Sequence, residues 1–457
     1  MSLARTGHQK AMQMELSLEE RGEAPGIERS GEFRAATNGT EDPGSDEALM
    51  KRVVENENVA KALKRVERNK GSPGIDGMTT EELRPYLRQN WRALREQLLG
   101  GNYQPKPVKT QEIPKSDGGV RKLGIPTVLD RFIQQAVLQV LQPRFDPSFS
   151  EGSYGFRPGR SAHDAVRAAQ RYVLEGKTWV VDVDLEKFFD RVNHDVLMSR
   201  LAKRISDKRL LGLIRRYLTA GVMVNGVVRE SGEGTPQGGP LSPLLANVLL
   251  DEVDKELEKR GLAFARYADD CNVYVKSKRA AEDAMATMRS LYEVLRLRIN
   301  ESKSAVGRPW NRKFLGYSFW TSRGKPKLCV AQQALNAMKK RVREITKRVG
   351  GRSMQAVGEE LQKYLPGWRN YFQLAETPKV FADVDRWIRH RIRALQLKQW
   401  KRVGTIERGL LRLGAQPKEA RGVAMQAGRW WAGSGTLTGG TLNLKYMRML
   451  GVPTLSC

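Results

Sequence analysis

The sequence predicts an α+β fold, in which short β-prone runs and helices alternate before a long helical stretch. The clearest sheet signal is 264–275, where two apolar runs flank Tyr267-Ala268-Asp269-Asp270 and give strand, tight turn and strand. The run from Trp179 to Val183 is typical of a largely buried strand. Apolar residues recur at helical spacing towards the C-terminus. The length of 457 residues suggests two or three domains.

Local signals place the other elements. Asp117-Gly118 marks the turn of a hairpin over 113–126, and a short strand is expected at 297–300. Gly100-Gly101 ends one of the helices. Helices are predicted at 49–70, 81–99, 130–141, 195–222 and 279–298.

Carboxylates stand where two of these strands end. Asp269 and Asp270 lie at the hairpin tip, where two adjacent negative charges repel each other and favour a divalent cation such as Mg²⁺. Asp184 follows the buried strand, and by two-residue alternation it shares a face with Asp182. An isolated Asp-Asp pair is more often a solvated turn, so the metal-site interpretation depends on the other motifs.

A loop rich in glycine and proline precedes a helix at 233–247. Gly234, Gly238 and Gly239 let the backbone approach a ligand closely, and Pro236 stiffens the loop. The start of the helix can present backbone N–H groups to phosphate, although an ordinary loop before a core helix has the same pattern. The apolar positions of that helix are Leu241, Leu244, Leu245, Val248, Leu249 and Leu250.

The net charge of +28 and the pI of about 10.1 indicate a polyanionic partner. A membrane surface is the competing polyanion, but the sequence has no run of 18 apolar residues and no signal-peptide pattern, so a soluble intracellular protein is expected. The three cysteines and four histidines predict neither a disulfide framework nor a zinc site.

Charge divides the chain unevenly. Residues 1–48 carry a net charge of −5 and little periodicity, which predicts a disordered tail. Residues 339–402 hold 17 Lys and Arg against 6 Asp and Glu, which favours a nucleic-acid surface over a merely solvated face. The apolar side of its last helix comprises Val384, Trp387, Ile388, Ile392 and Leu395, and Arg386, Arg389 and Arg393 lie opposite.

Five stretches together resemble a group II intron reverse transcriptase/maturase: 184–190, 235–243, 267–270, 297–303 and 314–317. The resemblance implies a right-hand polymerase with fingers, palm and an N-terminal extension over 49–322. An α-helical thumb/maturase domain would follow at 323–415, and a short DNA-binding-like region at 416–457. The scattered cysteines and histidines also predict that the chain lacks the HNH endonuclease domain of many such proteins.

The resemblance also implies roles for individual residues. Asp184, Asp269 and Asp270, with the carbonyl of Leu185, would hold two Mg²⁺ ions. Phe189 would exclude a 2′-hydroxyl, and Lys303 would protonate pyrophosphate unless it is a plain surface lysine. The nucleotide site would comprise Lys115, Arg121, Phe189, Gln237 and Lys303, with exposed basic hairpin residues as the alternative for the first two. The RNA-binding set would be Arg157, Arg160, Arg369, Arg386, Arg389 and Arg393.

The activity that the resemblance implies is RNA-directed DNA polymerase, with intron splicing and mobility by target-primed reverse transcription. The expected partners are intron RNA, an RNA template, a DNA primer or target and dNTPs, with no membrane. Self-association into a homodimer stays open. The expected location is the bacterial cytoplasm, with nucleoid association during action on DNA. The alternatives are a CRISPR-associated, retron-like or diversity-generating reverse transcriptase, or a splicing-only maturase.

Overall fold

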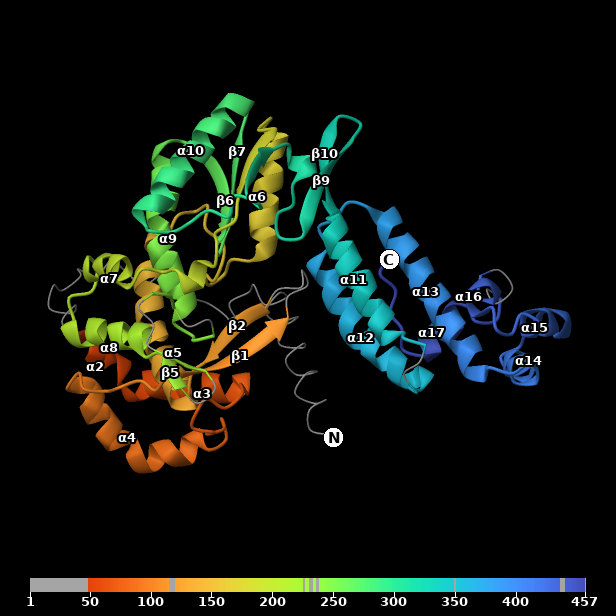
Figure 1. The fold of residues 1–457 in the computed structure, drawn as a ribbon, viewed down its shortest axis with the longest axis horizontal. Coiled ribbons are helices and arrows are strands. Elements are labelled where there is room, and N and C mark those ends of the chain that lie inside the picture. The colour runs from red at the N-terminus through yellow and green to blue at the C-terminus, as the bar shows by residue number, and fades with distance from the viewer. Residues whose placement is uncertain are drawn as a thin grey trace, which may run out of the picture. The chain divides into compact units, whose positions relative to one another are not determined.

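The computed structural model describes residues 48–114, 120–224, 227–229, 233–235, 238–348, 351–435 and 440–456. The chain divides into two compact units, with the division between Pro309 and Trp310 (Figure 1). The sequence had placed the corresponding boundary at 322 and 323.

The N-terminal unit alternates helices with short strands. Its helices are α2 (Leu49–Val53), α3 (Asn56–Asn69), α4 (Leu83–Leu99), α5 (Val128–Phe145), α6 (Ala162–Leu174), α7 (His194–Ala202), α8 (Lys208–Thr219), α9 (Ser242–Lys259) and α10 (Lys278–Val294). Its strands are β1 (Val108–Pro114), β2 (Val120–Ile125), β3 (Trp179–Val183), β4 (Val222–Val224), β5 (Val227–Arg229), β6 (Ala263–Tyr267), β7 (Asp270–Val275) and β8 (Ala305–Gly307).

A four-stranded sheet of order β6-β7-β3-β8 forms the centre of this unit. All its pairings are antiparallel, and the register sets Val183 opposite Cys271 and Tyr267 opposite Asp270. Helix α6 packs on one side of the sheet, and α9 and α10 pack on the other (Figure 1). The β6–β7 turn and the end of β3 lie at the same end of the sheet, here called its open end because Asp270 is exposed there and Asp184 and Asp269 are half-buried.

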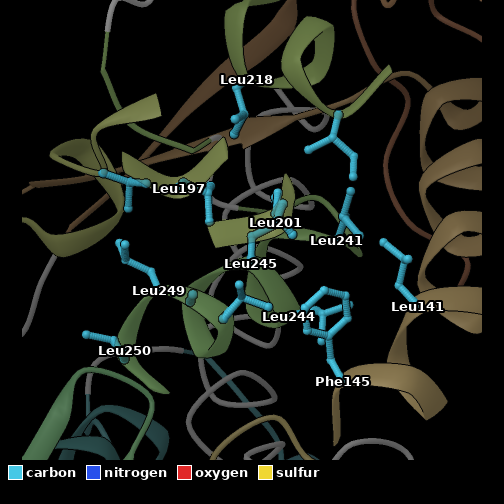
Figure 2. Close-up of a cluster of buried hydrophobic side chains, with 14 of the residues drawn as sticks. Leu141, Phe145, Leu197, Leu201, Leu218, Leu241, Leu244, Leu245, Leu249 and Leu250 are labelled. Carbon is cyan, nitrogen blue, oxygen red and sulfur yellow. The ribbon is translucent and has the colours of Figure 1, made fainter. Parts of the chain in front are cut away.

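Helix α9 is the centre of the hydrophobic core. All six of its predicted apolar positions are buried, as the sequence pattern indicated. Figure 2 shows its leucines among Leu197 and Leu201 of α7, Leu218 of α8, and Leu141 and Phe145 of α5. Burial on nearly every side fixes α9 firmly, so residues at its start and along its length can position other groups.

A second sheet, of order β2-β1-β4-β5, lies beside this core. Strands β1 and β2 form the predicted hairpin, with Pro114 opposite Val120, and the turn itself lies outside the described residues. Behind the hairpin, buried Asp130 accepts hydrogen bonds from Tyr103 (2.8 Å) and Thr127 (2.6 Å). Burial raises the pKa of the Asp130 carboxyl, and these hydrogen bonds oppose the rise.

The second unit is a hairpin followed by helices. Its strands are β9 (Tyr317–Ser322) and β10 (Lys325–Val330), and its helices are α11 (Gln332–Ile345), α12 (Met354–Tyr371), α13 (Pro378–Trp400), α14 (Val403–Arg412), α15 (Pro417–Ala424), α16 (Trp430–Gly433) and α17 (Leu444–Met449). The last described residues fold back onto α13, because Asp385 accepts hydrogen bonds from the backbone of Leu455 (2.9 Å) and Ser456 (2.8 Å).

Short polar side chains begin many of the helices by accepting a backbone N–H of the first turn, as helix N-caps do. Ser161 and Asp164 form a reciprocal capping box at the start of α6. The other side-chain N-caps that the structure shows are Thr127, Asn193, Asp207, Ser277, Ser353 and Asn443.

The strand predicted at 297–300 is wrong: in its place the structure has a single bridge between Leu185 and Ile299. The neighbour of β3 on that side is β8 instead. In the part of the chain that the structure describes, no helix is both long and apolar enough to span a bilayer.

Candidate active site

The three aspartates predicted as metal ligands have neighbouring backbone positions at the open end of the central sheet. Asp184 directly follows β3 and Asp270 begins β7. The register pairs Val183 with Cys271, so its continuation by one residue sets Asp184 opposite Asp270. Asp269 is in the two-residue turn between Tyr267 and Asp270. The backbone therefore brings together residues that are far apart in the sequence.

Asp182 occupies a different environment from Asp184. It lies inside the sheet, opposite Asn272 on one side and Ala305 on the other. By strand alternation it shares a face with Asp184, but it stands one full repeat back from the open end. The structure thus distinguishes Asp184 from Asp182, which the sequence pattern alone could not do.

The segment after α10 supports Asp184. The backbone N–H of Asn300 donates to the Asp184 carbonyl oxygen at 2.8 Å, and the Asp184 N–H donates to Ser304 Oγ at 3.0 Å. Lys303 lies between these two residues, and its Nζ is 3.7 Å from Asp184 Oδ2. The predicted nucleotide-site lysine is therefore placed beside a predicted catalytic carboxylate.

The donor set at this end consists of carboxylate oxygens, the ligands that Mg²⁺ prefers. Within the described ranges, however, no group of three or more His, Cys, Asp and Glu side chains is arranged to hold a metal ion. The backbone positions are adjacent, whereas the side chains do not converge.

Phe189 lies close to the Gly-rich loop. It belongs to the 3₁₀ turn Phe188–Asp190, and its half-buried ring packs edge-on against Phe188 at 5.0 Å. Its carbonyl oxygen accepts the Thr235 N–H at 2.7 Å. Gly234 has φ +93°, and a Cβ there would lie 2.9 Å from the Asp190 carbonyl oxygen, so only glycine fits.

His194 supports the Gly-rich loop, a role that the sequence did not indicate. Its ring is buried, and Nε2 lies 2.6 Å from the Gly234 carbonyl oxygen. Because a carbonyl oxygen only accepts, Nε2 carries the proton in this contact. The imidazole thus fixes the loop against the turn that holds Phe189.

The segment 152–157 runs beside β6. Arg266 N–H donates to the Gly152 carbonyl oxygen, and Tyr154 N–H donates to the Arg266 carbonyl oxygen, both at 2.8 Å. Gly155 packs against the β6–β7 turn, because a Cβ there would lie 2.3 Å from Ala268 N. This segment supports the β6–β7 turn through its backbone.

Arg157 is not available to RNA, which corrects the prediction. Its side chain is buried, and its guanidinium donates to the Asp146 carboxylate at 2.9 Å and to the Ser150 carbonyl oxygen at 2.6 Å. Arg160 is half-buried and pairs with Glu151 at 2.5 Å. The guanidinium of buried Arg157 is therefore satisfied by partners inside the protein.

The turn of the hairpin is held by a buried ion pair. Arg266 and Asp254 are both fully buried, with Nη2 and Oδ2 2.5 Å apart. Burial raises the pKa of the Asp254 carboxyl, and the Arg266 charge opposes that rise. Arg266 immediately precedes Tyr267, so a positive charge close to the carboxylate turn is fully neutralised inside the protein.

In the second unit, Arg369 has an internal role. Its Nε donates to the Leu455 carbonyl oxygen at 2.8 Å, and its guanidinium lies over the Phe381 ring at 4.6 Å. Neighbouring Trp368 and Phe372 are buried. The segment 367–372 therefore builds the interior of this unit, and RNA contact by Arg369 would require it to leave these partners.

The arginine face of α13 is divided. Arg386 is exposed and pairs with Asp383 at 3.1 Å. Arg389 and Arg393 are half-buried, and Arg393 donates to the Leu442 carbonyl oxygen at 2.7 Å. Burial lowers the pKa of Arg393, and the Arg389 charge adds to that effect.

Trp387 is not a core residue of α13, contrary to the prediction. It is half-buried, and the guanidinium groups of Arg343 and Arg391 lie 5.5 and 5.4 Å from its ring centroid. Ile388 and Ile392 are buried as expected. The tryptophan therefore stacks with cations at the surface of the core.

Some predicted nucleotide-site residues are only partly described. Lys115 and Gln237 lie outside the described residues. The backbone of Arg121 pairs with Ile113 across the β1–β2 hairpin. Leu185 has a buried side chain and joins Ile299 through the backbone bridge.

Two family models match the chain, one on most of the polymerase-like region and one on the helical region. Residues 113–319 match "Reverse transcriptase (RNA-dependent DNA polymerase)", and residues 335–413 match "Group II intron, maturase-specific domain".

Parts of the chain are also similar to curated proteins and to a solved structure. Protein YkfC of Escherichia coli is 35% identical over 299 residues, which cover 56% of this chain and 78% of YkfC. The group II intron-encoded protein LtrA of Lactococcus lactis is 36% identical over 192 residues, 42% of this chain and 31% of LtrA. A chain of the solved "Partial Cas6-RT-Cas1--Cas2 complex" is 29% identical over 54% of this chain and 41% of that chain, with a TM-score of 0.35.

The match to LtrA spans only about a third of that protein, so its whole activity does not transfer directly. The matched domains and the extent of the match to YkfC are sufficient for the family. The chain belongs to the group II intron reverse transcriptase/maturase family, and it carries the RNA-directed DNA polymerase domain and the maturase domain that define its members' roles in DNA synthesis and splicing.

Proposed function

We propose that the chain copies RNA into DNA at the open end of the central sheet, and that it binds its intron RNA to promote splicing and target-primed mobility. The single observation that carries the proposal is the register of β3 and β7, which sets Asp184 opposite Asp270 and beside the turn of Asp269. The test is extension of a DNA primer on an RNA template with dNTPs and Mg²⁺, in parallel with splicing of the enclosing intron. Splicing without extension would instead favour a splicing-only maturase.

In this proposal, Asp184, Asp269 and Asp270, with the Leu185 carbonyl, hold two Mg²⁺ ions. When bound, the ions would supply activation of the primer 3′-hydroxyl and neutralisation of the triphosphate charge. The adjacency of the three backbone positions supports this assignment. Lys303 is proposed to donate a proton to the leaving pyrophosphate, and the position of its ammonium 3.7 Å from Asp184 Oδ2 supports this role.

The nucleotide would be held between the carboxylates and the β1–β2 hairpin. Lys115 and Arg121 are proposed for the triphosphate and Gln237 for the primer–nucleotide site. Support comes from the loop's position: a Cβ at Gly238 would lie 2.6 Å from the carbonyl oxygen of Gly124 in β2. Gly238, which follows Gln237, and Gly124, which lies three residues after Arg121, are thus neighbours in space.

Phe189 is proposed to exclude ribonucleotides by a steric clash with the 2′-hydroxyl. Replacing Phe189 by Ala is expected to lower the ratio of catalytic efficiencies for dNTP over rNTP by about tenfold or more, since a lost discrimination of 1.4 kcal/mol is tenfold. Steady-state kinetics with both nucleotides measures the ratio. Phe189→Tyr, which keeps the bulk of the ring, is the matched control and should retain it. An unchanged ratio in the alanine variant would exclude Phe189 as the gate.

Residues 339–402 are proposed to bind intron RNA through phosphate contacts. Replacing Arg386 and Arg389 by Gln is expected to flatten the slope of log affinity against log salt by about 1.5, since each phosphate contact adds roughly 0.7–0.9. Filter binding of intron RNA across a salt series measures the slope.

Arg393→Gln is the control for this pair. Because Arg393 donates to the Leu442 carbonyl oxygen, the variant should lower the melting temperature. The salt slope should stay nearly unchanged. An unchanged slope in the Arg386/Arg389 variant, with a normal melt, would mean that this helix face is simply solvated.

A further inference from the structure

The turn that presents Asp269 adopts a backbone conformation that its own sequence does not favour. The loop between Tyr267 and Asp270 has two residues, and Ala268 has φ +57°. Glycine, asparagine and aspartate are the residues that adopt the left-handed region readily, whereas alanine does so at a cost in energy. Such a conformation persists when surrounding groups determine it, so the contacts around Ala268 matter for the position of Asp269.

The side chain of Arg266 provides one of these contacts. The guanidinium is fully buried, and all of its five N–H groups have acceptors. Nε donates to Asp254 at 2.8 Å, and Nη2 donates to Asp254 at 2.5 Å and to Ser153 Oγ at 2.7 Å. Nη1 donates to Asn247 Oδ1 at 3.0 Å and to the Ala268 carbonyl oxygen at 2.9 Å. One of the five N–H groups thus bonds the turn itself.

The partners of the guanidinium are rigid. Asp254 and Asn247 are buried residues of α9, the helix at the centre of the core. Asn247 Nδ2 also donates to the Gly155 carbonyl oxygen at 2.9 Å, and Gly155 packs against Ala268 N. The peptide units of Ala268 are therefore held from two sides, at the nitrogen by Gly155 and at the carbonyl oxygen by Arg266.

A buried ion pair of this kind can serve stability alone, and a hydrophobic pair can often replace it. That role would not require a hydrogen bond to the turn. We propose that Arg266 is a positioning residue for Asp269: its Nη1 fixes the peptide plane between Ala268 and Asp269, and with it the direction of the carboxylate. The proposal rests on the assignment of Asp269 as a metal ligand under the proposed function.

The test separates stability from positioning with the double variant Arg266→Met/Asp254→Leu, which removes both buried charges and the donor to Ala268. We expect a melting temperature close to that of the unmodified protein and unchanged hydrogen exchange in the strands, but faster exchange at the turn. The affinity for Mn²⁺, measured from free Mn²⁺ by electron paramagnetic resonance, should fall by about tenfold or more, as for other partners that orient metal ligands.

Ser153→Ala is the matched control, because it removes a different acceptor of the same guanidinium and leaves the Ala268 bond in place. It should keep the affinity for Mn²⁺ even if it lowers the melting temperature. Arg266→Lys is the second variant, in case the double variant does not fold. Its ammonium keeps the charge but lacks the planar fork, so it cannot serve Asp254 and Ala268 together.

Mn²⁺ binding by the double variant or by Arg266→Lys that equals that of the unmodified protein would overturn the proposal. The proposed function would still stand in that case if the unmodified protein extends primers. Conversely, if Asp269→Asn does not weaken Mn²⁺ binding, the assignment of Asp269 as a metal ligand fails, whatever the Arg266 variants show. The two failures are therefore distinguishable.

Discussion

Replacing Asp269 by Asn is expected to reduce primer extension on an RNA template by on the order of 100-fold or more, because the variant loses several kcal/mol of charge stabilisation in the transition state. Asn keeps the size of the side chain and removes its negative charge. The affinity for template RNA should be nearly unchanged, since carboxylates do not bind phosphate. Single-turnover extension and filter binding measure the two quantities separately.

Two further variants define the assignment more sharply. Asp184→Asn should behave like Asp269→Asn, because the strand register brings both residues to the same end of the sheet. Asp182→Asn should be far milder, since Asp182 lies inside the sheet opposite Asn272. If Asp182→Asn lost as much extension activity as Asp184→Asn, the wrong aspartate would have been assigned. Full activity of Asp269→Asn at saturating Mg²⁺ would contradict the assignment of these carboxylates as metal ligands.

Replacing Asp254 by Asn is expected to lower the free energy of unfolding of the N-terminal unit by about 3–5 kcal/mol, the usual cost of leaving a buried charge without its partner. Arg266 is fully buried and would keep its positive charge with only neutral acceptors. Chemical denaturation followed by circular dichroism measures the loss.

Glu256→Gln on the same helix is the control for Asp254→Asn. Glu256 pairs with Arg260 at the surface, so its replacement should leave the melting temperature unchanged. Equal stability of the Asp254→Asn variant and the unmodified protein would show that the pair is not the buried, charged contact that the structure describes.

The sequence predicted the elements whose signals are local. The strand Trp179–Val183, the hairpin around Asp269 and Asp270, and the leucine positions of α9 are all as expected, because alternation, turn residues and helical spacing are readable from a few neighbouring residues. The hairpin β9–β10 was missed. Its turn at Arg323-Gly324 has positive φ at both residues but lacks the Asn-Gly or Asp-Gly pair that marks such turns.

The sequence could not distinguish arginines that face solvent from arginines that the fold neutralises. The resemblance placed Arg157 in the RNA-binding set, but Asp146 and backbone carbonyl groups satisfy its guanidinium inside the protein. Arg266 gave no signal, because its partner Asp254 only becomes adjacent when α9 packs beneath the hairpin. Trp387 has core spacing on its helix, yet the arginines of α11 and α13 decide its environment. Such roles depend on tertiary contacts.

The most direct test of the central claim is a crystal structure of the protein with an RNA template, a DNA primer, a dNTP and Mn²⁺, read by anomalous scattering. The account predicts two Mn²⁺ peaks about 3.5–4 Å apart, bounded by Asp184, Asp269 and Asp270, with the nucleotide triphosphate on the same ions. Peaks at any other group of side chains, with Asp184 and Asp269 away from the metal, would contradict it.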